Sequence, residues 1–458
     1  MLQPARHQFA ALLGVVLLLA ACGTATRSGS PPASVQPSAT AASSAGLGVV
    51  VPAPGSSSSV YEPNPGAIVV AIDPGHGGCL DWGVPDPLKR GPDFSEKTMT
   101  LAIGLELKRV LEEQGITVVM TREADVALAG DDYPALGCNG PAFRDVNGDG
   151  KAGFDPEGKT RTRDELQARL DLVNLARADL LVSIHINSLT QNGVVFEIAA
   201  TQTYYTDETP WGPTATLHLA QLIQDGVVNG LDPVASYERQ DRGISAVNLY
   251  IVAPPLLVTT PERPDPVMQP TRGALMPAIL TEAGSITLAA EEDLLLSPEG
   301  QVAAAQGIAG ALAKYFGERP LAVRFDALVP GGAAGLAPEA VAGNAALIWA
   351  SVVDAGVLAD GIPVRLTNTG TAAWPVGLAV TAAWHASVDP YLRGAPDGLR
   401  PLATEIPALQ PGESVEIVLL LDPPADGTRE IAWITLANGE SSLADLGSPP
   451  LQLANALR

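Results

Sequence analysis

The sequence predicts two folded regions: an α/β domain with a mixed, largely parallel sheet flanked by helices, and a C-terminal all-β sandwich. Between residues 68 and 318, short apolar runs typical of buried strands alternate with segments whose apolar residues recur at helical spacing. After about residue 344, only short apolar runs separated by turn signals remain. The length of 458 residues and the 46% of hydrophobic residues suit a globular chain of two or three domains.

The elements of the α/β region follow from their patterns. Residues 68–72 form a continuous apolar run that ends at Asp73-Pro74-Gly75, which predicts a buried strand. Met99, Ile103 and Leu107 then recur at helical spacing. The same reasoning predicts strands at 116–120, 180–184, 194–198 and 278–281, and helices around 166–173 and 302–316.

The N-terminus predicts export. Arg6 and His7 precede an apolar run of signal-peptide length, which ends in Leu19-Ala20-Ala21-Cys22. This ending resembles a bacterial lipobox, so residues 1–22 are interpreted as a lipoprotein signal peptide with Cys22 as the lipidated residue. An ordinary secretory signal and an uncleaved anchor are the alternatives. All three place the protein outside the cytoplasm, and the first ties it to a membrane through a lipid anchor.

Composition divides the rest of the chain. Residues 23–66 are rich in Ser, Ala, Pro and Gly and predict a disordered tether. The α/β domain is expected at 67–319, with irregular insertions at 127–162 and 253–275 that are typical of lids, binding loops or disorder. A Gly- and Ala-rich linker at 320–343 then leads to the β-sandwich at 344–458.

Charge and cysteines limit the partners and the covalent links. The formal net charge of −23 would repel phosphate backbones, so the sequence argues against a nucleic-acid partner. Beyond Cys22, the chain has only Cys79 and Cys138. An extracytoplasmic location permits a disulfide between these two, and two free thiols are the alternative.

Four ionisable residues are expected at one edge of the sheet. His76, His185 and Glu282 each follow a predicted strand, and Glu96 opens the helix after the first strand. Ligands of open α/β sheets gather at the carboxyl ends of the strands. Two His and one Glu form a ligand set for catalytic zinc, and a further carboxylate nearby can transfer protons.

Each of these residues also has a structural interpretation. A His at a strand end can be a hydrogen-bonding structural residue, and Glu282 can be a solvated loop residue. Glu96 stands three residues after Asp93, which is the spacing of a helix capping box. From spacing alone, both interpretations stay open.

Several segments in this region carry a family resemblance: Val70–Gly78, Ser95–Lys97, Thr121-Arg122, Arg169 with Asn174 and Ala178-Asp179, Ser183–Ser188, Asp241–Gly243, and Pro277–Gly284. In this order they resemble the motifs of zinc-dependent N-acetylmuramoyl-L-alanine amidases of the amidase-3 type, and the resemblance covers about residues 68 to 318.

The resemblance implies a site and a reaction. His76, Glu96 and His185 would bind one zinc ion, and Glu282 would be the catalytic acid/base. The substrate would be peptidoglycan, cut at the amide bond between N-acetylmuramic acid and L-alanine by zinc-activated water, in wall remodelling or cell separation. Arg169 would hold its helix against the sheet.

The resemblance also leaves alternatives. A non-catalytic wall-binding or regulatory lipoprotein on the same fold is the rival interpretation, although all four site positions are filled. A zinc hydrolase acting on another amide is a third. Some relatives use an inserted segment to block the zinc until a protein partner moves it. Either insertion is therefore a hypothetical autoinhibitory segment, and a protein activator is a hypothetical partner.

A calcium loop is a further hypothesis in the first insertion. Asp145, Asn147 and Asp149 match the start of such a loop, but its twelfth position is Pro156 instead of an acidic residue. A turn without metal is the alternative.

The C-terminal sandwich resembles immunoglobulin-like modules through Asn368–Gly370, Trp374, Pro411–Glu413 and Trp433. It has no cysteine pair, and its tryptophans are expected in its core. We interpret the module as a spacer or as a domain that binds the wall or a partner.

Overall fold

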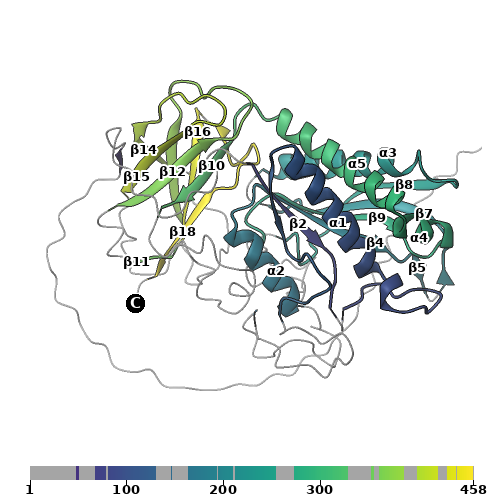
Figure 1. The fold of residues 1–458 in the computed structure, drawn as a ribbon. Coiled ribbons are helices and arrows are strands. Elements are labelled where there is room, and N and C mark those ends of the chain that lie inside the picture. The colour runs from purple at the N-terminus through teal and green to yellow at the C-terminus, as the bar shows by residue number, and fades with distance from the viewer. Residues whose placement is uncertain are drawn as a thin grey trace, which may run out of the picture.

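The computed structural model contains an α/β part and an all-β part (Figure 1). It describes residues 48–50, 68–78, 81–129, 146, 163–192, 194–209, 212–253, 273–328, 352–354, 361–385, 400–420, 431–439 and 441–456. Among the helices of these residues, none combines the length and the apolarity that a membrane span requires.

The α/β part is built on a six-stranded sheet with the order β3-β2-β4-β9-β7-β8. The strands are β2 (Val69–Pro74), β3 (Thr117–Met120), β4 (Leu180–Asn187), β7 (Ala199–Tyr205), β8 (Arg239–Ala246) and β9 (Ala278–Ser285). Neighbouring strands are parallel except β7 and β9, which are antiparallel. The prediction of a mixed, largely parallel sheet is therefore confirmed.

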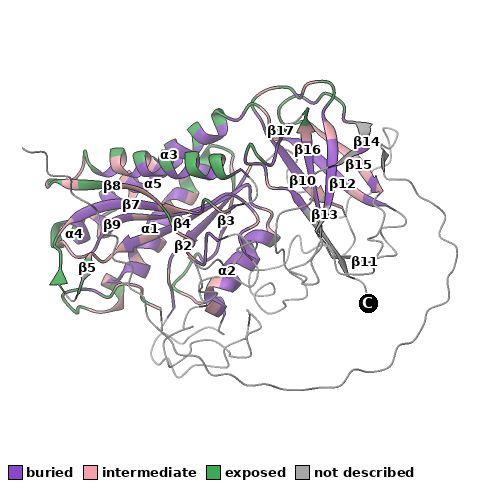
Figure 2. Ribbon diagram, turned by 180° about the vertical axis from the view of Figure 1, so that it is seen from behind, coloured by how far each residue is buried: buried purple, intermediate pink, exposed green. Residues whose placement is uncertain are grey.

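Helices cover both faces of this sheet. On one face lie α1 (Glu96–Glu113), α3 (Pro213–Leu231) and α5 (Pro298–Gly317), and on the other lies α2 (Arg163–Leu175). Strand β2 shows why the sheet is buried on both sides: Val70 and Ile72 pack into the first core, whereas Val69 and Ala71 pack into the second. Figure 2 shows β4 and β9 buried along most of their length.

Between residues 190 and 296 the structure differs from the sequence prediction in several elements. The single strand expected at 194–198 is wrong: β6 (Val194–Val195) pairs with β5 (Thr190–Gln191) in a small hairpin, and the sheet strand is β7. Helix α3, strand β8 and the short helix α4 (Ala289–Leu296) were not predicted. For α3 the signals were present, because Pro213 opens the helix and Leu219, Ile223 and Val227 are buried on one side of it.

The all-β part consists of two sheets around one core, with buried Trp374 among its core residues. One sheet has the order β1-β15-β12-β10, and the other has the order β11-β18-β16-β13-β14 with β17 beside β16. The strands are β1 (Gly48–Val50), β10 (Val323–Ala327), β11 (Val352–Asp354), β12 (Ile362–Asn368), β13 (Ala379–His385), β14 (Arg400–Glu405), β15 (Ser414–Leu420), β16 (Ile431–Asn438), β17 (Ser441–Ser442) and β18 (Leu451–Ala456).

Two strands of the sandwich lie outside its predicted range of 344–458. Strand β10 falls in the segment assigned to a linker, and it pairs with β12. The missed signal is alternation, because Val323 and Phe325 are buried in the sandwich core, Arg324 stands between them and Asp326 follows. Strand β1, within the predicted tether, pairs with β15.

The two parts are joined through buried polar groups. Arg324 of β10 donates from Nη1 to the backbone oxygen of Arg177 at 2.9 Å and lies 3.6 Å from the carboxylate of Asp179. Asp179 also accepts a hydrogen bond from the backbone N–H of Val69 at 2.8 Å. One buried carboxylate thus links the starts of β2 and β4 to the sandwich.

Candidate metal centre and active site

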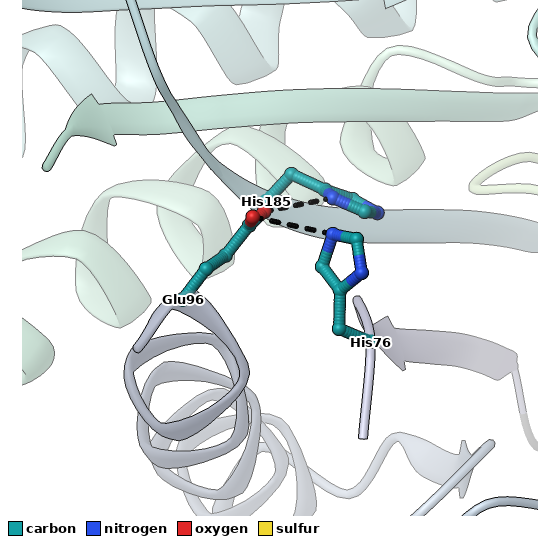
Figure 3. A group of neighbouring side chains, drawn as sticks. All are labelled: His76, Glu96 and His185. Atoms are coloured by element: carbon teal, nitrogen blue, oxygen red, sulfur yellow. Dashed lines mark hydrogen bonds and ion pairs between the residues drawn. The ribbon is translucent and has the colours of Figure 1, made fainter. Parts of the chain in front are cut away.

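His76, Glu96 and His185 come together at the carboxyl ends of β2 and β4 (Figure 3). One potential ligand atom from each lies within 4.8 Å of the others. His76 Nε2 is 3.2 Å from Glu96 Oε2, and His185 Nδ1 is 3.0 Å from Glu96 Oε1. Ligand atoms of a tetrahedral zinc ion lie about 3.3 Å apart when the bonds are about 2.0–2.1 Å long. The spacing and the chemistry of this donor set therefore fit zinc.

The carboxylate of Glu96 is fixed by the backbone around it. Glu96 Oε2 accepts a hydrogen bond from the N–H of Val84 at 2.8 Å, and Oε1 accepts one from the N–H of Ile186 at 2.9 Å. Burial opposes ionisation, but the charges of His76 and His185 outweigh it and hold the pKa of Glu96 well below its ordinary value. The capping-box alternative for Glu96 is wrong, because its carboxylate faces the histidines.

The backbone of His76 adopts a left-handed conformation. Its φ is 62°, and Gly77 after it has a φ of 140°. Few non-glycine residues adopt such an angle, so neighbouring groups must hold it. Arg169 does so by donating from Nη2 to the backbone oxygen of His76 at 2.6 Å. Arg169 also binds Asp73 across the α2–β2 contact, as its predicted structural role requires.

Glycine is required beside the histidine rings. A Cβ atom on Gly75 would lie 2.4 Å from the ring of His185. A Cβ atom on Gly83 would lie 2.4 Å from Glu96 Oε2 and 2.5 Å from the ring of His76. The Asp-Pro-Gly-His-Gly-Gly sequence and the loop after it therefore bring the backbone close to the ligands.

Asp81 orients His76 and was not predicted from the sequence. Its Oδ1 lies 2.7 Å from Nδ1 of His76, which leaves Nε2 to face Glu96. Burial opposes protonation, but the nearby carboxylates of Glu96 and Asp81 outweigh it and raise the pKa of His76 to about 10. A carboxylate on the second ring nitrogen is the usual support of a metal-binding histidine.

Replacing Asp81 by Asn should weaken metal binding. The amide keeps the shape but removes the negative charge that makes the His76 ring a stronger ligand, and such changes cost about 10- to 100-fold in metal affinity. Competition for zinc with a fluorescent chelator measures the affinity. Glu123→Gln is the matched control, because Glu123 is exposed and pairs with Lys108. Equal zinc affinities for the Asp81 variant and the control would contradict this role.

Glu282 lies on the strand next to His185. The two residues are register partners on β9 and β4, so their side chains are on the same face of the sheet. The Oε2 atom of Glu282 is buried, and it is without a hydrogen-bond partner among the described residues. Burial and the negative charge of Glu96 raise its pKa well above the ordinary value, although His76 acts in the opposite direction. The solvated-loop alternative for Glu282 is wrong.

A buried network supports the loop that carries His76. Asp73 accepts hydrogen bonds from Thr121 at 2.6 Å, from Ser183 at 2.7 Å and from Arg169 at 2.8 Å. Burial opposes the charge of Asp73, but Arg169 and these hydroxyl donors outweigh it and lower its pKa to about 2. The network fixes the last residues of β2, from which His76 projects.

Several predicted sites lie outside the described residues. These are Cys22, Cys79, Cys138, Asp145, Asn147 and Asp149. The lipidation site, the disulfide and the calcium loop therefore remain predictions, as does an autoinhibitory role for either insertion.

Two sequence relatives are N-acetylmuramoyl-L-alanine amidases. A germination-specific N-acetylmuramoyl-L-alanine amidase of Bacillus subtilis (strain 168) is 25% identical over 252 residues, which cover 55% of this chain and 81% of the relative. A sporulation-specific N-acetylmuramoyl-L-alanine amidase of the same organism is 25% identical over 251 residues, covering 54% and 68%.

A solved structure and a family model complete the comparison. The N-acetylmuramoyl-L-alanine amidase from Clostridium difficile 630 shares 25% sequence identity, with coverage of 55% of this chain and 97% of that chain and a TM-score of 0.36. The Amidase_3 model, described as N-acetylmuramoyl-L-alanine amidase, matches residues 70–314, more than half of the 458 residues. The chain therefore belongs to the Amidase_3 family of N-acetylmuramoyl-L-alanine amidases.

Proposed function

We propose that this peptidoglycan amidase is zinc-dependent, with His76, Glu96 and His185 as the metal ligands and Glu282 as the acid/base. The observation that carries the proposal is the convergence of the three ligand residues within 4.8 Å. Two further features support it: Asp81 supports the ring of His76, and Glu282 presents a buried oxygen without a partner among the described residues.

The proposed reaction is hydrolysis of the amide between N-acetylmuramic acid and L-alanine. Zinc, when bound, supplies a water of pKa near 7 and polarises the carbonyl. Glu282 takes a proton from the attacking water and passes it to the nitrogen of L-alanine. A new C–O bond forms and the C–N bond breaks, which leaves a carboxyl group on the muramic acid and a free amine on the peptide.

Dye release from labelled peptidoglycan tests the zinc dependence. We expect release by the purified protein to stop after chelation and to return when zinc is added. Metal analysis should give one zinc per chain, and His185→Ala should remove both the metal and the activity. Undiminished release from a metal-free preparation would contradict the proposal.

We also propose that the enzyme works outside the cytoplasm as a lipoprotein attached through Cys22, with the residues after it as a tether. The motif at Cys22 and the wall substrate support this location. Metabolic labelling with a fatty-acid analogue should mark the wild-type chain and leave Cys22→Ser unlabelled. Equal labelling of both chains would count against the lipid anchor.

For the β-sandwich we propose an immunoglobulin-like spacer or a module that binds the wall or a partner protein. Its two sheets around one core, without a cysteine among their described residues, suit such a module. Because β10 pairs with β12, we propose that the sandwich begins at about residue 323 and not at residue 344.

A further inference from the structure

A row of side chains crosses the sheet from the metal centre to its edge. His185 on β4 is the register partner of Glu282 on β9, and Glu282 is the register partner of Gln202 on β7. Beyond β7 lies β8, the last strand of the sheet. The row therefore leads from the proposed reaction centre towards solvent.

A β-bulge places Arg242 at the end of this row. Thr201 pairs with Asp241 and Thr203 pairs with Ile244, so the single residue Gln202 faces both Arg242 and Gly243. Gly243 has a φ of 67°, in the left-handed region that favours glycine. Bulges of this kind redirect a side chain, and here the Nε of Arg242 donates to Oε1 of Gln202 at 3.2 Å.

Gln202 is itself held in place. Its Oε1 also accepts a hydrogen bond from the hydroxyl of Tyr204 at 3.1 Å, and its Nε2 donates to the hydroxyl of Ser245 at 3.0 Å. Burial raises the pKa of Tyr204, the negative charge of Glu282 raises it further, and the charge of Arg242 lowers it. Tyr204 therefore lies within electrostatic range of both groups.

Arg242 presents a charge that the described residues do not neutralise. Its side chain is exposed, and no carboxylate of the described part of the chain pairs with it. By contrast, two other arginines of the α/β part form ion pairs: Arg169 with Asp73, and Arg239 with Glu291. In a chain with a net charge of −23, a guanidinium two strands from Glu282 and without an ion-pair partner among the described residues favours an anionic part of the substrate.

The distance between Glu282 on β9 and Arg242 on β8 suits the peptide part of the substrate. Strands in a sheet are about 4.8 Å apart, so β8 lies roughly 10 Å from β9. The side chain of Arg242 is directed towards β9, because its Nε donates to Gln202 on the strand between them. An extended peptide advances about 3.5 Å per residue. If the scissile amide lies beside Glu282, the peptide residue that follows L-alanine comes within reach of the guanidinium.

We propose that Arg242 binds the carboxylate of the stem-peptide residue that follows L-alanine and thereby makes the enzyme selective for substrates in which this group is free rather than amidated. The proposal rests on the proposed function, because it places the scissile amide beside Glu282. Gln202 acts as a positioning residue, since it holds Arg242 without contacting the peptide.

Two muramoyl-peptides that differ only in this group, one with a carboxylate and one with a carboxamide, test the proposal. Wild-type kcat/KM should favour the carboxylate by roughly 10- to 100-fold, the range expected for charged hydrogen bonds. Arg242→Gln should remove this preference and leave hydrolysis of the carboxamide substrate within about threefold, while Arg242→Lys keeps part of it because it retains the charge. Arg109→Gln, on the distant and exposed end of α1, removes the same charge and should keep the full preference.

A binding measurement tests the role of Arg242 independently of the proposed hydrolysis. In a Glu282→Gln background, in which turnover is strongly slowed, calorimetry should show tighter binding of the carboxylate peptide, and Arg242→Gln should abolish the difference. If wild type hydrolyses neither peptide but this binding difference is present, the proposed reaction fails and the role of Arg242 stands. Equal binding of both peptides, or equal losses on both when Arg242 is changed, would overturn the role of Arg242.

Discussion

Glu282→Gln should lower kcat of peptidoglycan hydrolysis by about 10²- to 10⁴-fold, the contribution of a positioned acid/base group. The amide has the size of the carboxylate but cannot take a proton from water and return it to the leaving amine. Because Glu282 is not among the three grouped ligand residues, zinc content should stay at the wild-type level. Dye release and metal analysis on the same preparation measure both quantities.

The matched control for this variant is Glu113→Gln. Glu113 lies at the exposed end of α1 and pairs with Arg109, so its loss changes the net charge equally without reaching the site. A zinc-loaded Glu282→Gln protein that keeps more than about a tenth of the control's rate would remove Glu282 from the acid/base role.

Arg169→Met should lower the free energy of unfolding by about 3–5 kcal/mol, because it removes one partner of a buried ion pair and leaves the other uncompensated. The carboxylates of Asp73 and Glu165 would lose their cation, and the backbone oxygen of His76 would lose its donor. Met retains most of the volume, so the effect comes mainly from charge. Urea unfolding at pH 7 measures it.

The pH dependence of the free energy of unfolding distinguishes the loss of charge from the loss of packing in Arg169→Met. The pKa of Asp73 is about 2 in the folded protein and about 3.9 in an unfolded chain. A depressed carboxyl pKa stabilises the protein above the unfolded value, and this contribution disappears as the pH falls from about 4 to about 2. The difference between wild type and Arg169→Met should shrink over that interval. A difference that stays constant would assign the effect to packing.

A surface control completes the design. Arg109 forms exposed ion pairs with Glu106 and Glu113 on one face of α1. Such pairs contribute about 0–1 kcal/mol, so Arg109→Met should change stability little at any of these pH values.

The sequence predicted the residues that stand at strand ends better than those that support them. His76 and His185 follow apolar runs, and parallel strands bring such positions to one edge of a sheet. Asp81 had no such signal, because its role depends on how the loop after Gly77 folds back over His76. The carboxylate that supports His76 was therefore visible only in the structure.

The fold was predicted best where apolar patterns are strong. Strand β2 and helix α1 are confirmed, since both bury a continuous or periodic set of apolar residues. Strand β8 was missed because it is an edge strand with only partly buried or exposed residues and without a hydrophobic run. Its bulge, which directs Arg242 towards Gln202, likewise follows from pairing with β7 and not from local sequence.

The contact between Arg324 and Asp179 has a mechanical consequence. Asp179 stands just before β4 and His185 lies near the other end of that strand, roughly 20 Å away at about 3.3 Å per residue. The contact with the sandwich therefore lies at the end of β4 opposite His185, so a movement of the sandwich reaches the sheet far from the proposed ligands.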